Sequence, residues 1–299
     1  MNYVVTGGAG FIGSNIAKIL VNQGHSVTVI DNLHSGKLES LESIKNKIKF
    51  KNINILHSDK LESIISDCDG IFHQAALISV VESFEKEEQY FDVNVNGTKN
   101  IFEIAKKYHK RVIYASSSSV YGNPKQIPIK ENYVRKSFNP YAMTKLKDEI
   151  LAEQFTKNGL DVLGLRYFNV YGIGQTGTYA GVITQFLRNL KENKSPIING
   201  DGSQLRDFIH VEDVAKANLI AMESKVKHGF FNIGTGQKTS ILELAKIMIN
   251  ISGLKLNPIF TSLANGDVEL SQADTTLSKK LLNWNSSITL EEGLKQLFD

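Results

Sequence analysis

The feature that most constrains the fold is a glycine-rich turn near the N-terminus. The turn Thr6-Gly7-Gly8-Ala9-Gly10-Phe11-Ile12-Gly13 follows a strand-like run at Asn2–Thr6 and opens a segment with helical spacing at Phe11–Asn22. Glycine permits a sharp strand-to-helix turn, and its missing Cβ lets a phosphate approach the backbone. Free N–H groups at the start of the helix would point at that anion. The residues expected at a dinucleotide pyrophosphate are Gly7, Gly10, Phe11, Ile12 and Gly13.

The first half of the chain repeats this alternation of short strands and helices. Further strands are expected at Ser26–Ile30, Ile48–Ile55, Gly70–His73, Arg111–Ala115 and Asp161–Tyr167, and further helices at Lys86–Tyr108 and Pro140–Lys157. Such alternation predicts a parallel sheet that helices cover on both faces. After about residue 167 the pattern is less regular. Helices are expected there at Ala180–Lys191, Val211–Met222, Ile241–Ile251, Thr275–Leu282 and Leu290–Phe298.

We therefore expect an α/β fold: a Rossmann-type doubly wound parallel sheet with a smaller mixed α/β substrate-binding domain. Residues 1–166 are expected to form the dinucleotide-binding domain, with roughly 206–232 returning to it, and residues 167–299 the substrate-binding domain. No linker or internal repeat separates the two parts, so we expect them to share an interface.

Composition excludes several other classes of protein. Apolar residues make up 41% of the chain and charged residues 22%, which suits a globular protein with a large core. No apolar run approaches the ~20 residues that span a bilayer, and Met1 leads directly into a strand, so we expect neither a membrane anchor nor a secretory signal. The lone Cys68 excludes a disulfide framework and an all-cysteine metal site. We expect a cytoplasmic protein without a metal.

The net charge of +3 does not indicate a nucleic-acid partner. Basic residues are dispersed, and neither an arginine-rich run nor an interleaved aromatic platform accompanies them. A mild positive balance is equally compatible with a small anionic ligand.

Asp31 ends the second expected strand, near the ~20-residue offset at which a carboxylate binds the adenosine ribose. A carboxylate accepts hydrogen bonds from both ribose hydroxyls and repels a 2′-phosphate. The sequence therefore predicts NAD, rather than NADP, as the cofactor.

Tyr141 and Lys145 stand four residues apart at the start of an expected helix, so they share one helix face. A nearby ammonium favours the phenolate form of tyrosine, which makes Tyr141 a candidate base. Such pairs also occur on surface helices without a function. Upstream, four serines at 116–119 end the fifth strand, where α/β folds place ligands, although a solvated turn is the alternative.

These motifs resemble the extended short-chain dehydrogenase/reductase superfamily, and more closely its nucleotide-sugar 4-epimerases. The match runs over essentially the whole chain and includes Asp31–Leu33, His73–Ala76, Asn94–Thr98, Ser116–Gly122, Tyr141–Lys145, Arg166–Gly172 and Gly200–Val211. The resemblance implies UDP-sugar chemistry on tightly held NAD+. A proton and a hydride leave C4, and the resulting 4-keto sugar rotates and accepts the hydride on its other face.

The resemblance also implies roles for individual residues. Ser117 corresponds to the catalytic hydroxyl, Tyr141 to the base and Lys145 to its partner. The other cofactor contacts that it implies are Asn32, Asp59 at the adenine, Ala75, Asn94, and Tyr167 beside the nicotinamide. The substrate contacts that it implies are Ser79 at the sugar, Ser117, Asn169 at the diphosphate-sugar, Arg206 at a phosphate, and Ser271 at the C2 substituent.

Particular residues narrow the expected reaction and substrate. Related sugar dehydratases carry acidic residues after the catalytic hydroxyl, whereas Ser118 and Ser119 stand there, which disfavours dehydration. Ala264 replaces an arginine that grips the diphosphate in epimerases, and Phe208 replaces a common tyrosine. The small Ser271 leaves room for an N-acetyl group, so we expect UDP-GlcNAc and UDP-GalNAc alongside UDP-glucose and UDP-galactose.

Two alternatives to an epimerase stay open: a nucleotide-sugar oxidoreductase, and a non-catalytic regulator that binds NAD or a sugar nucleotide. The helices at Lys86–Tyr108 and Pro140–Lys157 resemble the pair that forms an intersubunit four-helix bundle in relatives. Their apolar positions include Phe91, Val95, Ile150 and Phe155. We therefore expect a homodimer.

Overall fold

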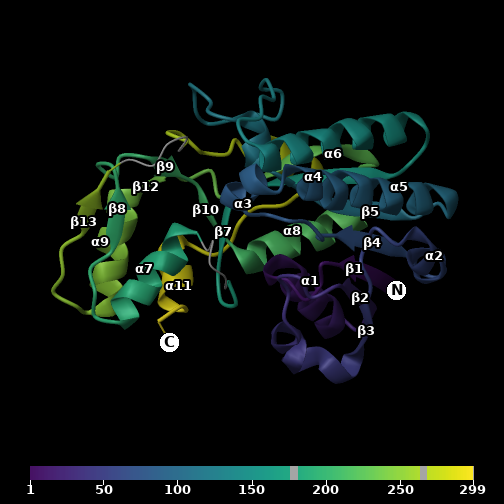
Figure 1. Ribbon diagram of the computed structural model, residues 1–299, viewed down its shortest axis with the longest axis horizontal. Coiled ribbons are helices and arrows are strands. Elements are labelled where there is room, and N and C mark those ends of the chain that lie inside the picture. The colour runs from purple at the N-terminus through teal and green to yellow at the C-terminus, as the bar shows by residue number, and fades with distance from the viewer. Residues whose placement is uncertain (176–180, 263–267, 299) are drawn as a thin grey trace.

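A twisted parallel sheet forms the larger part of the molecule in the computed structural model (Figure 1). The structure describes residues 1–175, 181–262 and 268–298. Within these ranges seven strands pair in the order β11-β6-β5-β4-β1-β2-β3, and every pairing is parallel. The strands are β1 (Asn2–Thr6), β2 (Ser26–Asp31), β3 (Ile48–Asn52), β4 (Gly70–His73), β5 (Arg111–Ser117), β6 (Val162–Tyr167) and β11 (His228–Ile233). This arrangement confirms the predicted Rossmann-type α/β fold.

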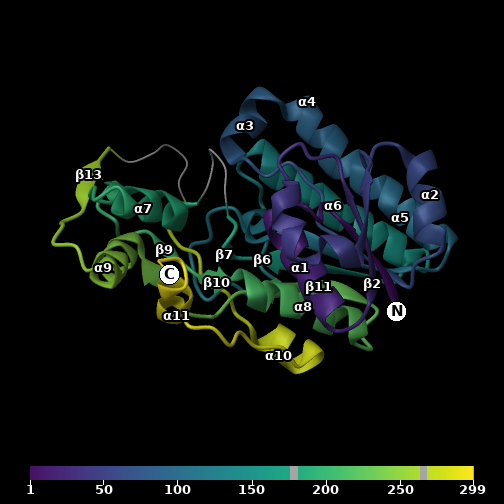
Figure 2. The same cartoon turned by 90° about the horizontal axis from the view of Figure 1, so that it is seen from below.

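Helices cover both faces of the sheet (Figure 2). One face carries α1 (Phe11–Asn22) and α8 (Val211–Glu223), and the other carries α2 (Ser58–Ser66), α5 (Gly97–Lys107) and α6 (Pro140–Lys157). Successive residues of β1 serve opposite faces: Val5 joins the core under α1, and Val4 joins the core under α5. Because both faces are buried, β1, β4 and β5 carry buried apolar residues at successive positions rather than at alternate ones.

The long helix predicted at 86–108 forms with an interruption. It consists of α4 (Glu87–Tyr90), a π-helical turn η2 (Phe91–Asn96) and α5. A π-turn shifts the side chains that follow it around the helix axis. Asn94 lies in this turn and is completely buried. Helices that periodicity did not indicate are α2, η1 (Leu38–Lys47), α3 (Val80–Glu85) and η3 (Ser118–Tyr121).

The smaller part of the molecule lies beside the carboxyl ends of the sheet strands (Figure 1). Its helices are α7 (Val182–Lys191), α9 (Ile241–Ser252) and α11 (Leu290–Lys295), which enclose a separate apolar core. Its paired strands are β7 (Asn169–Tyr171) with β10 (Phe208–His210), β8 (Ile197–Asn199) with β13 (Ile259–Thr261), and β9 (Leu205–Arg206) with β12 (Thr239–Ser240). These short strands are missing from the sequence-based prediction.

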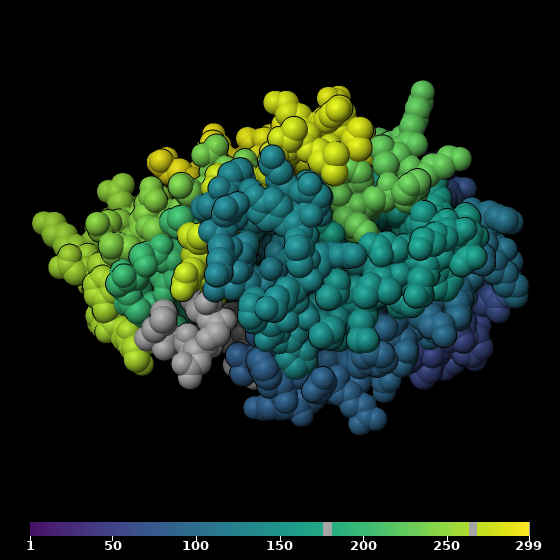
Figure 3. Space-filling model, turned by 90° about the horizontal axis from the view of Figure 1, so that it is seen from above, coloured from purple at the N-terminus to yellow at the C-terminus, as the bar shows by residue number. Residues whose placement is uncertain are grey.

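The chain crosses between the two parts more than once. After β6 it enters the smaller part, and α8 and β11 bring it back to the large sheet. The last elements are α10 (Thr276–Leu282) and α11. Figure 3 shows the connection between η3 and α6 raised on the surface between the two parts. In the part of the chain that the structure describes, no helix is both long and apolar enough to cross a bilayer.

Candidate functional site

A cavity of about 400 Å³ lies at the carboxyl ends of the sheet strands, where open α/β sheets bind ligands. Its walls come from the β1–α1 turn, the ends of β2, β4, β5 and β6, and the start of α6. The sequence-predicted residues that line it are Gly7, Gly10, Phe11, Ile12, Gly13, Asp31, Asn32, Ala75, Ser117, Tyr141, Lys145 and Tyr167. Tertiary folding thus gathers the predicted nucleotide-binding and catalytic residues around one space.

The phosphate loop, residues 7–13, leaves no room for a side chain at Gly7 or Gly13. A Cβ on Gly13 would lie 2.2 Å from the carbonyl oxygen of Gly7, and Gly7 itself has a φ of +64° and abuts the backbone of Ala75. Gly10 caps α1 without any side-chain hydrogen bond. The N–H groups of the first helical turn therefore remain available to an anion. This backbone cradle fits the pyrophosphate of a dinucleotide.

Asp31 lies at the end of β2 with its carboxylate held by backbone N–H groups. Leu33 N donates to Oδ1 at 2.8 Å, and Ala9 N donates to Oδ2 at 3.0 Å. Each oxygen keeps a further acceptor site, since an ionised carboxylate offers about four in all. The carboxylate is therefore oriented to accept hydrogen bonds from the hydroxyls of a ribose seated beside the phosphate loop.

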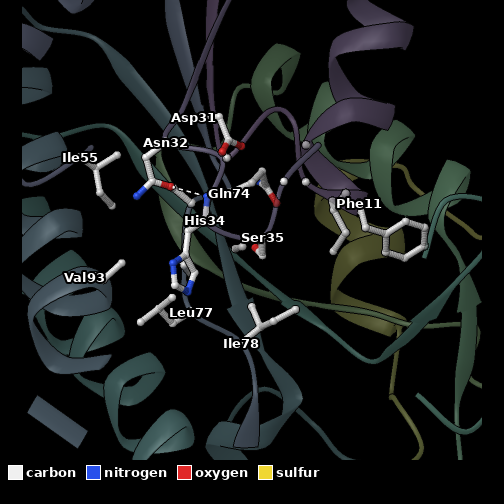
Figure 4. Close-up of a pocket in the computed structure, with 18 of the residues that line it drawn as sticks. Phe11, Asp31, Asn32, His34, Ser35, Ile55, Gln74, Leu77, Ile78 and Val93 are labelled. Carbon is white, nitrogen blue, oxygen red and sulfur yellow. Dashed lines mark hydrogen bonds between the residues drawn. The ribbon is translucent and has the colours of Figure 1, made fainter. Parts of the chain in front are cut away.

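At the end of the cavity next to β2 and β3, the residues that line it differ from the residue that was predicted. Asp59 is exposed in the first turn of α2 and does not line the cavity. Ile53, Asn54 and Ile55, which directly follow β3, line it instead. Figure 4 shows Ile55 and Val93 at one end of the cavity and Phe11 at the other. The sequence signal for Asn54 and Ile55 was their place at the end of a strand, at the carboxyl edge of the sheet. Asp59 lies away from that edge because it belongs to α2, which begins at Ser58.

Ser117, Tyr141 and Lys145 approach the cavity from two neighbouring elements. Ser117 ends β5, and its hydroxyl accepts a hydrogen bond from Ser119 N at 3.2 Å. Tyr141 and Lys145 occupy successive turns of α6. That helix begins where it does because Pro140 is at its first turn and Asn139 caps it, its side chain accepting from Ala142 N at 2.8 Å.

Lys145 is almost completely buried, with 4% of its surface exposed. Its Nζ donates to Oδ2 of Asp148 at 3.3 Å, one turn further along α6. The ammonium therefore lies between the cavity and a buried carboxyl group. No sequence motif had indicated Asp148.

Asn94 stands behind the cavity rather than on its surface. Its Oδ1 accepts from Leu77 N at 2.8 Å, and its Nδ2 donates to Leu77 O at 3.0 Å and to Thr144 Oγ1 at 2.9 Å. All the hydrogen bonds are made to protein groups. The amide thus joins the cavity wall at Leu77 to helix α6, which carries Tyr141.

His73 lies beneath the phosphate loop with both ring nitrogens engaged. Nδ1 lies 2.7 Å from Thr6 Oγ1, and Nε2 lies 2.9 Å from Thr98 Oγ1. Burial lowers the pKa of His73 to about 3, and the charge of Lys145 adds to this effect. The imidazole is therefore neutral at physiological pH and joins β1, β4 and α5 through hydrogen bonds.

Tyr167 belongs to a buried polar network that also orients Gln74. The Tyr167 hydroxyl lies 3.0 Å from Gln74 Oε1, and Asn218 Nδ2 donates to the hydroxyl at 2.8 Å. Burial raises the pKa of Tyr167. The phenol therefore stays neutral while it lines the cavity, and Gln74 lines the cavity with it. Gln74 was part of a recognised motif, but only its partners reveal its orientation.

Of the predicted substrate residues, Ser117 lines this cavity, and the other four lie outside its lining. Ser79 is buried and caps α3, its hydroxyl accepting from Glu82 N at 3.1 Å. Asn169 donates to the carbonyl of Asp207 at 3.2 Å on the β7–β10 pair. In the smaller part, Arg206 Nη1 and Ser271 N both donate to Leu205 O, at 2.9 Å and 3.1 Å.

Asp207 organises that region of the smaller part. It is fully buried, and its carboxylate accepts from the backbone N–H groups of Thr235, Gly236 and Ala273 at 2.8–3.0 Å. Burial raises the pKa of Asp207, and these hydrogen bonds oppose the increase. Ala264 lies outside the described residues. Among the residues that are described, no group of His, Cys, Asp and Glu is arranged to hold a metal.

Comparison with known proteins supplies an independent finding. Residues 3–234 match the model of the NAD dependent epimerase/dehydratase family. A "Putative UDP-glucose 4-epimerase" of Methanocaldococcus jannaschii is 39% identical over 98% of this chain and 96% of its own length.

Two solved structures are similar along nearly the whole chain. UDP-glucose 4-epimerase from Thermotoga maritima, crystallised with UDP-glucose, has 36% identity and a TM-score of 0.94, covering 99% of this chain and 97% of that one. UDP-N-acetylglucosamine 4-epimerase from Methanobrevibacter ruminantium, in complex with UDP-N-acetylmuramic acid, has 35% identity and a TM-score of 0.95, covering 99% and 96%.

Proposed function

Because this chain belongs to the NAD dependent epimerase/dehydratase family, we propose that it is an NAD-dependent UDP-sugar 4-epimerase that inverts C4 through a 4-keto sugar. The observation that carries the proposal is the single cavity in which the phosphate loop and Asp31 meet Ser117, Tyr141 and Lys145. A cofactor site and an acid–base group that share one space suit a reaction in which the cofactor need not leave.

The residues divide the work as follows. The phosphate loop and Asp31 hold the cofactor, and bound NAD+ supplies a hydride acceptor that also returns the hydride. Tyr141 takes the proton from the C4 hydroxyl and gives it back, while Ser117 orients that hydroxyl by hydrogen bonding. Lys145 favours the tyrosinate by its positive charge. Rotation of the 4-keto sugar within the site would present its other face to the bound cofactor.

The substrate range that we propose includes N-acetylated sugars. Ser271 is small and buried beside β9. We propose that the C2 substituent of the sugar lies next to it, where a bulky side chain would remove the space. The similar protein of M. ruminantium is named for UDP-N-acetylglucosamine, and the similar protein of T. maritima for UDP-glucose. We therefore propose both the UDP-glucose/UDP-galactose and the UDP-GlcNAc/UDP-GalNAc pairs, with Asn169 and Arg206 at the diphosphate.

We further propose a homodimer formed through α4, η2 and α6. Phe91, Met143 and Ile150 are apolar residues of these elements that are between 38% and 42% exposed, and Phe91 and Met143 line a shallow hollow between them. Val95 is buried within the protein and Phe155 packs against the core under α5, so these two contribute to folding.

The single cysteine, Cys68, is buried and supports the cytoplasm as the expected compartment.

The experiment that tests the function is incubation of the purified protein with the four UDP-sugars, followed by NMR of the products. The expected result is interconversion of C4 epimers without added cofactor, with NAD released on denaturation. An oxidoreductase would instead change the nicotinamide redox state in proportion to substrate consumed. A regulator would bind NAD or a UDP-sugar without turnover, and either of these outcomes contradicts the proposal.

A further inference from the structure

A buried carboxyl group stands directly behind the candidate catalytic lysine. Asp148 is fully buried in α6, and its Oδ2 lies 3.3 Å from Lys145 Nζ, whose side chain is only 5% exposed. In the part of the chain that the structure describes, its other oxygen, Oδ1, has no partner with hydrogen-bond geometry. A buried carboxylate without a full set of partners is costly, so its retention beside Lys145 calls for an electrostatic explanation.

The other groups around Asp148 leave Lys145 as its ionic partner. On the same helix, Glu149 is committed elsewhere: it accepts from Arg166 Nε at 2.7 Å and from Arg135 Nη1 at 3.0 Å. It also accepts from Ser116 of β5 at 2.6 Å.

The neighbouring elements present neutral groups to this carboxyl. Thr98 of α5 lies 2.9 Å from His73 Nε2 through its hydroxyl, which also provides a hydrogen bond that lowers the pKa of Asp148. Burial keeps His73 of β4 uncharged by lowering its pKa to about 3. Burial and the nearby acidic groups also raise the pKa of Tyr114 of β5, which stays a neutral phenol.

Burial places the ionisation of Asp148 close to neutrality. Desolvation raises the pKa of Asp148 to about 7, and the charge of Glu149 adds to this increase. The charge and hydrogen bond of Lys145, and a weaker hydrogen bond of Thr98, act against it. The carboxyl therefore changes charge in the range in which a tyrosine base would work.

We propose that Asp148 is a positioning residue that acts through Lys145: its ionised carboxylate holds the ammonium and partly cancels the positive charge that Lys145 presents to Tyr141. This inference rests on the proposed function only for the role of Tyr141 as the base. When Asp148 takes up a proton, the Lys145 charge is no longer offset, and Tyr141 then ionises more readily. The pH range of activity then extends further to the acid side, because protonation of Asp148 helps Tyr141 to stay ionised at lower pH.

The test measures ionisation of Tyr141 directly in the NAD-bound protein. Tyrosinate absorbance near 295 nm is titrated with pH, and the Tyr141→Phe curve is subtracted, because the chain contains 10 tyrosines. Asp148→Asn keeps the volume of the side chain and removes its charge. We expect its Tyr141 midpoint to fall by about half a pH unit or more, with a steeper transition than the wild type. The acid limb of the kcat profile is expected to move by the same amount, with little change in KM.

Two comparisons isolate the route through Lys145. Glu153→Gln removes a carboxylate of the same helix that is 43% exposed and pairs with Arg135, and it is expected to leave the midpoint unchanged. In a Lys145→Met background, Asp148→Asn is expected to shift the Tyr141 midpoint no further. An equal shift in that background would overturn the route through Lys145.

An unmoved midpoint in a folded Asp148→Asn protein, with kcat merely lowered at every pH, would overturn the proposal in favour of a structural role. If Asp148→Asn fails to fold, the wild-type absorbance titration of Tyr141 tests the proposal instead. Coupling to Asp148 requires a transition shallower than that of a single independent group, and a transition of ordinary steepness would overturn it. Absence of turnover with every UDP-sugar would contradict the proposed function, whereas the absorbance titration would still decide the role of Asp148.

Discussion

The carboxylate of Asp31 accepts a hydrogen bond from the backbone N–H of Ala9 at 3.0 Å, which ties the end of β2 to the phosphate loop. One side chain therefore shapes both the ribose and the pyrophosphate regions of the cavity. Leu33 N donates to the other carboxylate oxygen, so backbone groups of the protein itself hold the carboxylate in place. Substitution of Asp31 is thus expected to loosen the loop as well as remove a ribose contact.

Asp31→Ala is expected to weaken NAD binding at least tenfold, because a charge-assisted hydrogen bond contributes about 1.5–3 kcal/mol. It is also expected to reduce discrimination against NADP, since the repulsion of a 2′-phosphate disappears. Calorimetry on nucleotide-free protein measures both affinities. Asp31→Asn serves as the matched variant that keeps the shape and loses the charge. Equal wild-type affinity for NAD and NADP would contradict this account.

Tyr141→Phe is expected to retain bound NAD but to lose epimerisation by roughly 10²–10⁴-fold, the range typical of general acid–base groups. Lys145→Ala is expected to lose activity as well, because the phenolate loses its neighbouring positive charge. Product NMR measures turnover, and absorbance of the nucleotide released on denaturation measures the cofactor. Tyr133→Phe, outside the cavity lining, is the matched control. Activity of Tyr141→Phe near the wild-type level would assign the base to another group.

His73 is expected to make the protein sensitive to acid. Its pKa is lowered from 6.5 to about 3 in the folded state, so below about pH 6.5 the unfolded chain binds a proton that the folded chain does not. The contribution of His73 to the free energy of unfolding is therefore complete above about pH 6.5. It decreases as the pH drops towards 3, by an amount on the order of a few kcal/mol.

Urea unfolding of wild type and His73→Gln at several pH values measures this contribution. The variant is expected to lose less stability between pH 7 and pH 5 than the wild type does. His57→Gln, at an exposed histidine, is expected to follow the wild type. Parallel pH dependence in wild type and His73→Gln would rule out this source of acid sensitivity.

Ser271→Tyr is expected to suppress conversion of UDP-GlcNAc and UDP-GalNAc at least tenfold more than that of UDP-glucose and UDP-galactose. The ring would occupy volume next to the C2 substituent, and overpacking is costly. Ser271→Ala, which adds no volume, is expected to keep both activities. Wild-type turnover of UDP-galactose without detectable turnover of UDP-GalNAc would contradict the proposed pocket.

Phe91→Asp is expected to weaken the proposed dimer by placing a charge in the apolar face of η2 and α6. Sedimentation at micromolar concentration is expected to give a two-chain species for the wild type and a larger single-chain fraction for the variant. Ile259→Asp, at an apolar residue of β13 that is 53% exposed, serves as the control and is expected to stay dimeric. A wild-type protein that sediments as one chain would contradict the interface.

The sequence by itself determined the fold class and the local parts of the site. The turn at Gly7–Gly13 is specified by neighbouring residues, because a Cβ on Gly13 would collide with Gly7 within the same turn. The pairing of Tyr141 with Lys145 follows from helical periodicity alone. Both features depend on residues that are close along the chain, so their spacing can be recognised in the sequence alone.

Only the tertiary structure decided which distant side chains meet. Asp59 and Asn54 lie near each other in sequence, yet only Asn54, which follows β3, lines the cavity. Asp59 is exposed because it belongs to α2, which begins at Ser58. Asp148 became a candidate because packing of α6 against the sheet removes it from water beside Lys145. Burial and pairing between separate segments are set by how complete elements pack together, and the free energy of a charge depends on that environment rather than on its position in the chain.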